Sequence, residues 1–368
     1  MVVTFTSIFI VSFIIQLVYY LPVYLRIFKP DNRFENKHYL PPVSIIISAR
    51  NEAENLRNFL PLILNQDYPN FEVVVVNDNS EDKTQDVLLR YKKKYENLII
   101  LNADKNIFEE GNKKSAITKA ILSAKNNLLI FTDADCYPVS NKWLKKMTSA
   151  YSENTEILIG FGAYEEQRGF LNKIIRYETL FNTLQFMSFA DLGFPYMAVG
   201  RNLSYKKSVF LKIKGFESHK DIISGDDDLF INDAANRKNT NIITDFESKT
   251  ISIPKDSFKT YFNQKKRHFS SSSKYRLRNK IIIGIEIITR FLFYLFFVVL
   301  LIYGNNYRIV LAILFVRIIV SLTVIKLFAL KMKESNILFF IPIFDILIPV
   351  LNLIVFTGTV FDNKIRWK

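Results

Sequence analysis

Long apolar stretches lie at both ends of the chain. The first runs from Val2 to Leu25 without a charged residue, which is longer than the about 20 residues that a helix needs to cross a hydrocarbon core. It has neither a basic segment before it nor a small-residue cleavage site after it, so we expect an uncleaved transmembrane anchor in residues 1–26. Three more apolar stretches close the chain, at about residues 281–303, 307–330 and 337–360. This pattern predicts an integral membrane protein.

The central part, residues 40–278, has a different pattern. Short runs rich in β-branched residues alternate there with segments whose apolar residues recur at helical spacing. The strand-like runs are VSIIIS (43–48), FEVVVVND (71–78), LIILNA (98–103) and NLLIFT (127–132). The alternation predicts an α/β domain with a mostly parallel sheet and flanking helices. Residues 279–368 then form a C-terminal membrane region with two to three spanning or interfacial helices.

The C-terminal apolar segments carry charges and prolines. Glu286 and Arg290 lie four residues apart, a spacing at which they pair on one helix face or lie at the membrane interface. The last segment contains Pro342, Asp345 and Pro349, which favours a kinked or re-entrant path. Four plain crossings would also put the basic tail at 364–368 on the wrong side by the charge rule. We therefore expect one of the three segments not to be a full crossing.

Basic residues set the net charge of +14 and gather at the membrane junctions. They include Arg26, Lys29, Arg33, Lys37, Lys265, Lys266, Arg267, Lys274, Arg276, Arg278 and Lys280. Because positive flanks mark the cytoplasmic side, we expect the central domain in the cytoplasm and the charge to serve the membrane, not nucleic acid. The single cysteine, Cys136, excludes an intramolecular disulfide and a cysteine-based zinc site. Charges within the apolar segments, at Arg317, Lys326 and Asp345, are costly and often functional, which leaves room for a lipid-linked acceptor.

Two carboxylates one residue apart, Asp133 and Asp135, directly follow the apolar run 127–132. In an extended segment residues i and i+2 point the same way, so the two acids can share one hard divalent cation. Acidic pairs are also common at strand ends because the chain meets water there. The pair alone is therefore weak evidence, and the surrounding motifs decide its interpretation.

Polar residues also follow the first two predicted strands, at Arg50-Asn51-Glu52 and Asn77-Asp78-Asn79-Ser80. Ligands of α/β sheets bind outside the carboxyl ends of the strands, where these carboxylates can accept hydrogen bonds from a nucleobase or ribose. The glycine-rich phosphate signatures GxGxxG and GxxxxGK[ST] are absent from the sequence. An equally good interpretation of Asn51 and Ser80 is that they are ordinary helix caps.

Seven ordered segments resemble those of family 2 glycosyltransferases, membrane-attached inverting enzymes with the A-type glycosyltransferase fold. They are SIIISARNEAENL, VVVVNDNSEDKT, NKKSAITKAI, FTDADC, GRNLSYKKS, SGDDDLF and QKKRH, and they span residues 43 to 268. The resemblance implies transfer of a sugar from a nucleotide-sugar donor, expected to be UDP-linked. It also implies a bound Mg²⁺ or Mn²⁺ and a role in making glycans of the cell envelope.

The resemblance assigns roles to individual residues. Glu52 and Asp78 correspond to contacts with the nucleoside, and Lys113 to the lysine near the diphosphate. Asp135 corresponds to the direct metal ligand, with Asp133 nearer the ribose and phosphates and contributing to the metal site. A divalent cation there would stabilise the negative charge that develops on the leaving diphosphate.

An inverting transfer also needs a base for the proton of the acceptor hydroxyl. The segment Ser224 to Leu229 (SGDDDL) offers three adjacent carboxylates. Alignment on the leucine assigns the base to Asp226, and alignment on the glycine assigns it to Asp227; we favour Asp226. Adjacent carboxylates raise one another's proton affinity when desolvated, which suits a base, but acids also suit a solvated helix N-terminus.

The QKKRH segment stands where the family carries QxxRW. Gln264 and Arg267 are assigned to the nucleotide sugar, since a guanidinium matches phosphate geometry. Arg201, Asn202 and His268 are assigned to the acceptor. Because His268 replaces a tryptophan that stacks on the acceptor sugar in processive members, we expect one or a few additions to a lipid-linked or saccharide acceptor. Lys265 and Lys266 also fit a basic collar at the membrane.

Two other classes of function remain open from the sequence. A membrane-anchored nucleotidyltransferase also uses paired acids and a metal, although it usually carries a glycine-rich phosphate signature. A sugar- or lipid-binding scaffold without activity would not need intact acids at Asp133, Asp135 and Asp226.

Overall fold

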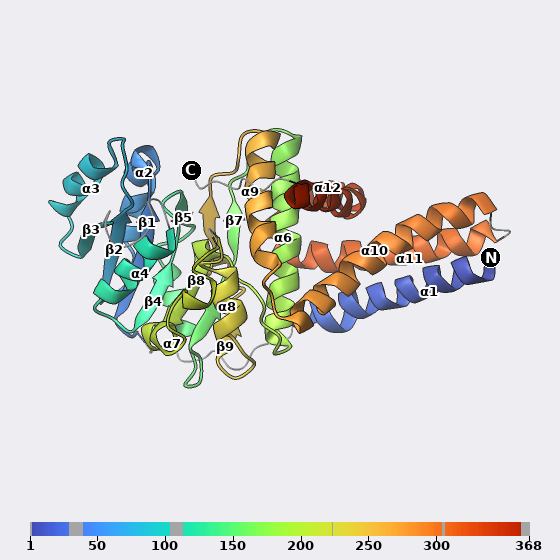
Figure 1. Ribbon diagram of the computed structural model, residues 1–368, viewed down its shortest axis with the longest axis horizontal. Coiled ribbons are helices and arrows are strands. Elements are labelled where there is room, and N and C mark those ends of the chain that lie inside the picture. The colour runs from blue at the N-terminus through green and yellow to red at the C-terminus, as the bar shows by residue number, and fades with distance from the viewer. Residues whose placement is uncertain (1, 29–39, 104–112, 223, 304–305, 362–368) are drawn as a thin grey trace.

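The computed structural model describes residues 2–28, 40–103, 113–222, 224–303 and 306–361 (Figure 1). A mixed α/β domain lies at one end, and long apolar helices project from it. The predicted fold class, an α/β domain with attached membrane helices, is confirmed.

A seven-stranded sheet forms the centre of the domain, in the order β3-β2-β1-β4-β8-β6-β9. Its strands are β1 (Val43–Ala49), β2 (Phe71–Asn77), β3 (Leu98–Asn102), β4 (Leu128–Phe131), β6 (Ile157–Ile159), β8 (Leu203–Lys206) and β9 (Thr240–Ile242). The first four strands are parallel to one another, whereas β8 is antiparallel to both β4 and β6. The four strands predicted from the sequence are therefore confirmed. Their carboxyl ends meet at one edge of the sheet.

Both faces of the sheet are covered, which explains why its strands are apolar throughout. On one face Ile45 and Ile47 pack against α2 (Ala53–Leu64), α3 (Thr84–Lys92) and α5 (Trp143–Ser149). On the other face Ile46 packs in a core that includes α4 (Lys113–Ser123), α6 (Phe170–Asp191) and α8 (Asp228–Ala234). Because successive side chains of a strand point to opposite faces, each strand contributes to two separate cores.

A small second sheet, in the order β5-β10-β7, lies beside the carboxyl edge of β4. Its strands are β5 (Cys136–Pro138), β7 (Gly162–Tyr164) and β10 (Thr250–Ser252). β5 begins directly after Asp135, so the acidic pair lies in the connection between the two sheets. The remaining domain helices are α7 (Lys207–Lys212) and α9 (Phe258–Ser272).

Within the described residues, four helices are long and apolar enough to cross a membrane: Val2–Phe28, Leu277–Tyr303, Tyr307–Lys331 and Asn336–Val355. The first comprises α1 (Val2–Val18) and its continuation to Phe28, and the next two are α10 and α11. These three lie side by side and project away from the domain (Figure 1). The last, α12 (Ile341–Phe361), runs in a different direction, across the base of the bundle next to α6 and α9. The expectation that one of the three C-terminal segments is not a full crossing stays a prediction.

A network of buried polar side chains joins the apolar helices. Glu286 and Arg290 pair within α10, as their spacing predicts. Asp345 of α12 pairs with Arg317 of α11, and Gln16 of α1 accepts a hydrogen bond from Arg317 (3.0 Å). All four charged side chains are buried, and two acids balance two arginines. The charges predicted to be costly therefore neutralise one another between helices, whereas Lys326 lies on the exposed face of α11.

The long helix α6 connects the domain to the membrane helices. Its Glu178 binds Lys265 of α9, which also binds Asn352 of α12. Its Arg176 binds Glu334 (2.6 Å), just after α11. Lys265 is buried in this junction, which corrects the expectation that it belongs to an exposed basic collar. Lys274, Arg276, Arg278 and Lys280 are exposed, and Lys29, Arg33, Lys37 and the tail 364–368 lie outside the described residues.

Candidate functional site

The loops after β1 and β2 are fastened to each other. The backbone N–H of Asn51 donates to Ser80 Oγ (2.9 Å), and the backbone N–H of Glu81 donates to Asn51 Oδ1 (2.8 Å). Asn51 and Asn79 adopt positive φ values of 55° and 50°, a conformation that asparagine tolerates better than most residues. The caps of α2 and α3 are instead Glu52 and Lys83. The interpretation of Asn51 and Ser80 as ordinary helix caps is therefore wrong.

This fastened pair of loops positions the two acids assigned to the nucleoside. Glu52 accepts a hydrogen bond from Asn55 Nδ2 (2.6 Å), and its backbone N–H donates to Thr84 Oγ1 (2.9 Å). Asp78 is buried at the carboxyl end of β2, and its backbone N–H donates to Ala49 O (2.8 Å). Burial raises the pKa of the Asp78 carboxyl, and nearby Arg50 opposes that rise. The two acids thus lie at the ends of neighbouring strands, as the sequence predicts.

Lys113 lies between two carboxylates that are far apart in the sequence. Its Nζ is 3.1 Å from Asp133 Oδ1 and 2.9 Å from Asp226 Oδ2. Burial alone would lower the pKa of Lys113, but Asp133, Asp226 and Asp227 hold it well above its ordinary value. Burial alone would raise the pKa of Asp226, and Lys113 keeps it below the ordinary value. The Asp226 carboxylate is therefore ionised in this site.

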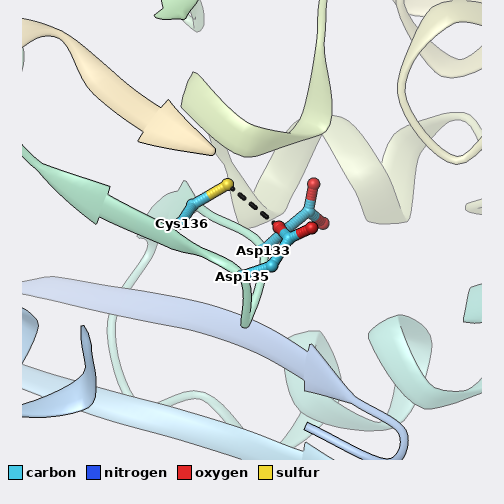
Figure 2. A group of neighbouring side chains, drawn as sticks. All are labelled: Asp133, Asp135 and Cys136. Atoms are coloured by element: carbon cyan, nitrogen blue, oxygen red, sulfur yellow. Dashed lines mark hydrogen bonds between the residues drawn. The ribbon is translucent and has the colours of Figure 1, made fainter. Parts of the chain in front are cut away.

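The acidic pair forms a compact cluster with the cysteine that follows it (Figure 2). One potential ligand atom each from Asp133, Asp135 and Cys136 lie within 4.8 Å of one another. Asp135 Oδ1 accepts hydrogen bonds from Cys136 Sγ (3.2 Å) and Ser252 Oγ (3.3 Å). Burial, and then Asp135, raise the pKa of the Cys136 thiol well above its ordinary value.

This donor set fits a hard divalent cation. Burial and the Asp133 charge raise the pKa of Asp135, which is the situation that a bound cation relieves. Carboxylate oxygens are the ligands that Mg²⁺ and Mn²⁺ prefer. A protonated, buried thiol contributes little to such a site.

The other two acids of the SGDDDL segment have different environments from Asp226. Asp227 caps α8: its Oδ1 accepts from the Asp228 N–H (2.7 Å) and its Oδ2 from the Gly200 N–H (2.8 Å). Burial, then Asp226 and Asp228, raise the pKa of Asp227 to about 7. Asp228 accepts hydrogen bonds from Ser271 and Tyr275, at and beyond the end of α9. Asp227 and Asp228 therefore hold the segment in place.

A pocket opens at the carboxyl edge beside Lys113. Its polar lining comes from Ser48, Lys113, Thr132, Asp133 and Asp226, and its floor from apolar side chains of the sheet. Thr132 is buried, and its Oγ1 has no hydrogen-bond partner among the described residues. The pocket thus brings together residues from β1, β4, α4 and the loop before α8. Asp227 does not line it.

The residues assigned to the acceptor do not all lie at this site. Arg201 donates from Nε to Gly162 O (2.9 Å), and its guanidinium lies 4.4 Å from the centroid of the Tyr164 ring. Asn202 is fully buried and satisfied: Nδ2 donates to two backbone carbonyls, and Oδ1 accepts from Trp143 Nε1 (3.1 Å). Asn202 therefore supports the core and does not face an acceptor, which corrects the assignment from the sequence.

The QKKRH segment lies on α9. Gln264 Nε2 donates to Tyr164 Oη (3.1 Å), so Gln264 and Arg201 converge on one tyrosine. The His268 side chain is exposed to solvent. The backbone carbonyl of Arg267 accepts a hydrogen bond from Ser224 Oγ (3.0 Å), which ties α9 to the SGDDDL segment.

Sequence reasoning missed several residues that support this site. Ser252 and Tyr164 come from strands of the small sheet, and Ser271 and Tyr275 bind Asp228 from the end of α9 and just beyond it. Single serines and tyrosines carry no local signal in the sequence. Only the folded chain shows which of them reach the acids.

Comparisons with known proteins identify a family for the central domain. Residues 44–213 match the family model described as glycosyl transferase family 2. A glycosyltransferase (AglE) from Haloferax volcanii is 35% identical over 123 residues, which are 33% of this chain and 39% of that protein. A dolichyl-phosphate beta-glucosyltransferase from Trichomonas vaginalis is 32% identical over 139 residues, which are 34% of this chain and 41% of that protein. The chain thus spans less than half the length of these curated relatives.

A solved structure extends the likeness to the whole chain. A mannosyltransferase from Pyrobaculum calidifontis, in complex with GDP-Man and Mn²⁺, superposes with a TM-score of 0.58 at 17% identity, over 95% of this chain and 97% of that one. At this identity the likeness shows the fold alone. Together with the family model, it shows that the chain contains a glycosyl transferase family 2 domain, matched over residues 44–213, and has the A-type glycosyltransferase fold.

Proposed function

We propose that the chain transfers a sugar from a nucleotide-sugar donor to a lipid-linked or saccharide acceptor, with inversion and with a divalent cation. The observation that carries the proposal is the position of Lys113 between Asp133 and Asp226. Asp133, Lys113 and Asp226 line one pocket, which supports roles for them as cation-binding acid, phosphate-binding lysine and base.

The donor half of the site is proposed from the strand ends. Glu52 and Asp78 would accept hydrogen bonds from the nucleoside, and Lys113 would bind the diphosphate. The match to the family model and the GDP-Man bound by the Pyrobaculum mannosyltransferase support a nucleotide sugar. UDP remains our expectation for the nucleotide.

Asp135, with Asp133, would hold Mg²⁺ or Mn²⁺. When bound, the cation would supply positive charge that stabilises the leaving diphosphate. The Mn²⁺ in the same mannosyltransferase supports this assignment. Ser252 would fix the orientation of Asp135 through its hydrogen bond.

Asp226 would act as the base. Its carboxylate would take the proton of the acceptor hydroxyl as that oxygen attacks the anomeric carbon and the bond to the diphosphate breaks. The ion pair with Lys113 keeps Asp226 ionised and ready to accept a proton. Asp227 is less suited, because both of its oxygens already accept backbone N–H groups.

The acceptor is proposed to approach from the membrane side. α9 carries Gln264, Arg267 and His268 and lies between the site and α12, while α6 lies along the base of the helix bundle (Figure 1). Relatives named for a dolichyl-phosphate acceptor support a lipid-linked one. We keep the division into an anchor at 1–26, a cytoplasmic domain at 40–278 and a membrane region at 279–368 as part of the proposal.

A donor screen with the purified protein tests the proposal. We expect one nucleotide sugar to release its nucleoside diphosphate, faster when the acceptor is present. In a parallel assay with nucleoside triphosphates and sugar 1-phosphates, release of pyrophosphate as a nucleotide sugar forms would instead indicate a nucleotidyltransferase. Turnover of none of the nucleotide sugars would contradict the proposal and favour the binding scaffold.

A further inference from the structure

A second lysine of α4, Lys114, is buried next to the site. Its side chain is only 3% exposed, and Nζ donates to His219 O (2.6 Å) and Ile222 O (2.8 Å). Adjacent residues of a helix point about 100° apart, so Lys113 and Lys114 reach different partners from one turn. Lys113 reaches the carboxylates, and Lys114 reaches the backbone that leads to Asp226.

The segment that Lys114 binds is the turn before Asp226. Its described residues are 217–222, which include the short helix Glu217–His219, and 224–225, where Gly225 has a φ of 98°. The His219 ring Nε2 lies 3.0 Å from Gly225 O, within hydrogen-bond distance. A side chain at position 225 would collide with Leu229 at 2.5 Å, so the turn into Asp226 depends on this glycine. Contacts with Lys114 and His219 thus hold the turn at three carbonyl groups.

Burying a lysine is unfavourable, so its place needs compensation. Burial lowers the pKa of Lys114 to about 8, and the neighbouring acids Asp226, Asp228, Asp227 and Asp221 oppose this effect. Lys114 in turn helps to lower the pKa of Asp226. Lys114 therefore influences Asp226 in two ways: its charge lowers the pKa of the carboxyl, and its hydrogen bonds hold the backbone that precedes Asp226.

We propose that Lys114 is a positioning residue: it holds the turn 217–225 so that the carboxylate of Asp226 stays beside Lys113 and the donor pocket. The proposal rests on the role of Asp226 as the base. In this proposal α4 has two roles. Lys113 binds the donor, and the next residue, Lys114, fixes the position of the base Asp226 relative to it. Lys114 itself touches neither substrate.

The test compares Lys114→Met with Lys119→Met in the full-length protein. Lys119 is a matched control, because it lies on the same helix and donates to a backbone carbonyl, Asn102 O (2.6 Å), away from the acids. We expect Lys114→Met to lower kcat by about 10- to 100-fold, as a misplaced catalytic group does. The KM for the donor should change by less than about threefold, because Lys113 and the strand ends remain. Lys119→Met should keep kcat within about twofold.

Hydrogen exchange supplies a readout that does not depend on activity. We expect amides of the turn 217–225 to exchange faster in Lys114→Met than in the wild type, with other segments unchanged. If the methionine variant fails to fold, Lys114→Gln, which keeps an N–H donor, takes its place, with the same direction and a smaller effect on kcat. An unchanged kcat, or a lowered kcat without faster exchange of the turn, would overturn the proposal. An inactive wild type would instead refute the proposed function, while the exchange comparison would still report on the turn.

Discussion

The three consecutive aspartates, Asp226 to Asp228, have three different sets of binding partners. Asp226 faces Lys113 and the pocket, Asp227 accepts two backbone N–H groups, and Asp228 binds side chains at the end of α9 and beyond. Their different partners move their pKa values apart: burial and like charges raise those of Asp227 and Asp228, whereas Lys113 lowers that of Asp226. Identical side chains therefore gain different properties from where the backbone places them.

Asparagine at position 226 should lower turnover at least about a hundredfold, because the amide cannot take the proton of the acceptor hydroxyl. Donor affinity should change little, since we propose that Lys113 binds the donor whereas Asp226 acts on the acceptor hydroxyl. Steady-state kinetics of Asp226→Asn and Asp227→Asn will distinguish the two registers. A near-normal Asp226→Asn beside an inactive Asp227→Asn would show that Asp227 is the base.

The pH dependence of kcat/KM offers an independent check. The pKa of Asp226 lies below its ordinary value, so the base is already ionised at neutral pH and activity should not fall between about pH 8 and 6. A base at Asp227 would lose its activity as the pH falls through about 7, because protonation removes the accepting form. An acid limb near neutrality that disappears in Asp227→Asn would therefore contradict our assignment.

Alanine at position 135 should abolish donor turnover while the fold remains intact. Asp135 supplies a carboxylate to the candidate cation site and accepts hydrogen bonds from Cys136 and Ser252, so its loss removes one charge and these two hydrogen bonds while the strands stay paired. Donor turnover at graded Mg²⁺ and Mn²⁺, with circular dichroism as the control for folding, provides the measurement. Full activity of the wild type in excess chelator would refute the metal requirement.

At the scale of elements, α6 and α9 determine how the domain meets the membrane helices. Glu178 on α6, Lys265 on α9 and Asn352 on α12 form one buried junction. In a second buried junction, Glu334 pairs with both Arg176 on α6 and Lys249. These contacts fix α9, and with it Gln264 and His268, relative to the apolar helices.

The buried pair Arg317–Asp345 predicts a cost for removing one partner. Arg317→Met leaves Asp345 without its closest counter-charge between α11 and α12, and loss of one partner of a buried pair typically costs about 3–5 kcal/mol. Thermal unfolding of the purified protein in detergent should show a clearly lowered midpoint. Lys326→Met on the same helix is the control, because Lys326 is exposed and should leave the midpoint nearly unchanged. Equal midpoints for both variants would show that the polar network does not hold the bundle.

At the scale of the whole molecule, the direction of α12 decides the topology. α1, α10 and α11 lie side by side, whereas α12 crosses the base of the bundle where α6 and α9 lie (Figure 1). Three crossings with an in-plane α12 would return the chain to the side of the catalytic domain. We predict this topology, because the charge rule favours the same side for the basic sequence at 364–368 and for the basic residues that flank the domain.

Topology reporters will test this arrangement. We expect a reporter fused after residue 368 to lie on the side of the catalytic domain, in the cytoplasm, and a label at Asn306 between α10 and α11 to lie on the opposite side. The physical reason is that one crossing, α1, separates the N-terminus from the domain, whereas two crossings, α10 and α11, return the chain to the side of the domain. A C-terminal reporter on the side of Asn306 would show that α12 is a fourth crossing.

Product length is a second property of the whole molecule. His268 offers less stacking area than an indole, so an elongated acceptor would be held less firmly between cycles. We expect one or a few additions when the protein is reconstituted in membranes with its donor and a lipid-phosphate acceptor. Sizing the products by mass spectrometry would decide the matter, and a ladder of tens of sugars would contradict the expectation.

The sequence by itself determined the parts whose signals are local. Four apolar segments, the alternation of strands and helices, and the acids at the strand ends follow from short-range periodicity, which solvent and hydrogen bonding impose on neighbouring residues. Even the Glu286–Arg290 pair follows from helical spacing. These features need only the geometry of single elements.

The tertiary structure decided what depends on distant segments. Lys113 meets Asp226, Lys114 meets His219 and Lys265 meets Asn352 only because the sheet and α6 bring separate elements together. Asn202, assigned to the acceptor from its motif, proved to be a core residue, since side-chain direction is set by packing. The path of α12 likewise follows from its partners, because an apolar helix satisfies its backbone in any orientation and only side-chain contacts choose one.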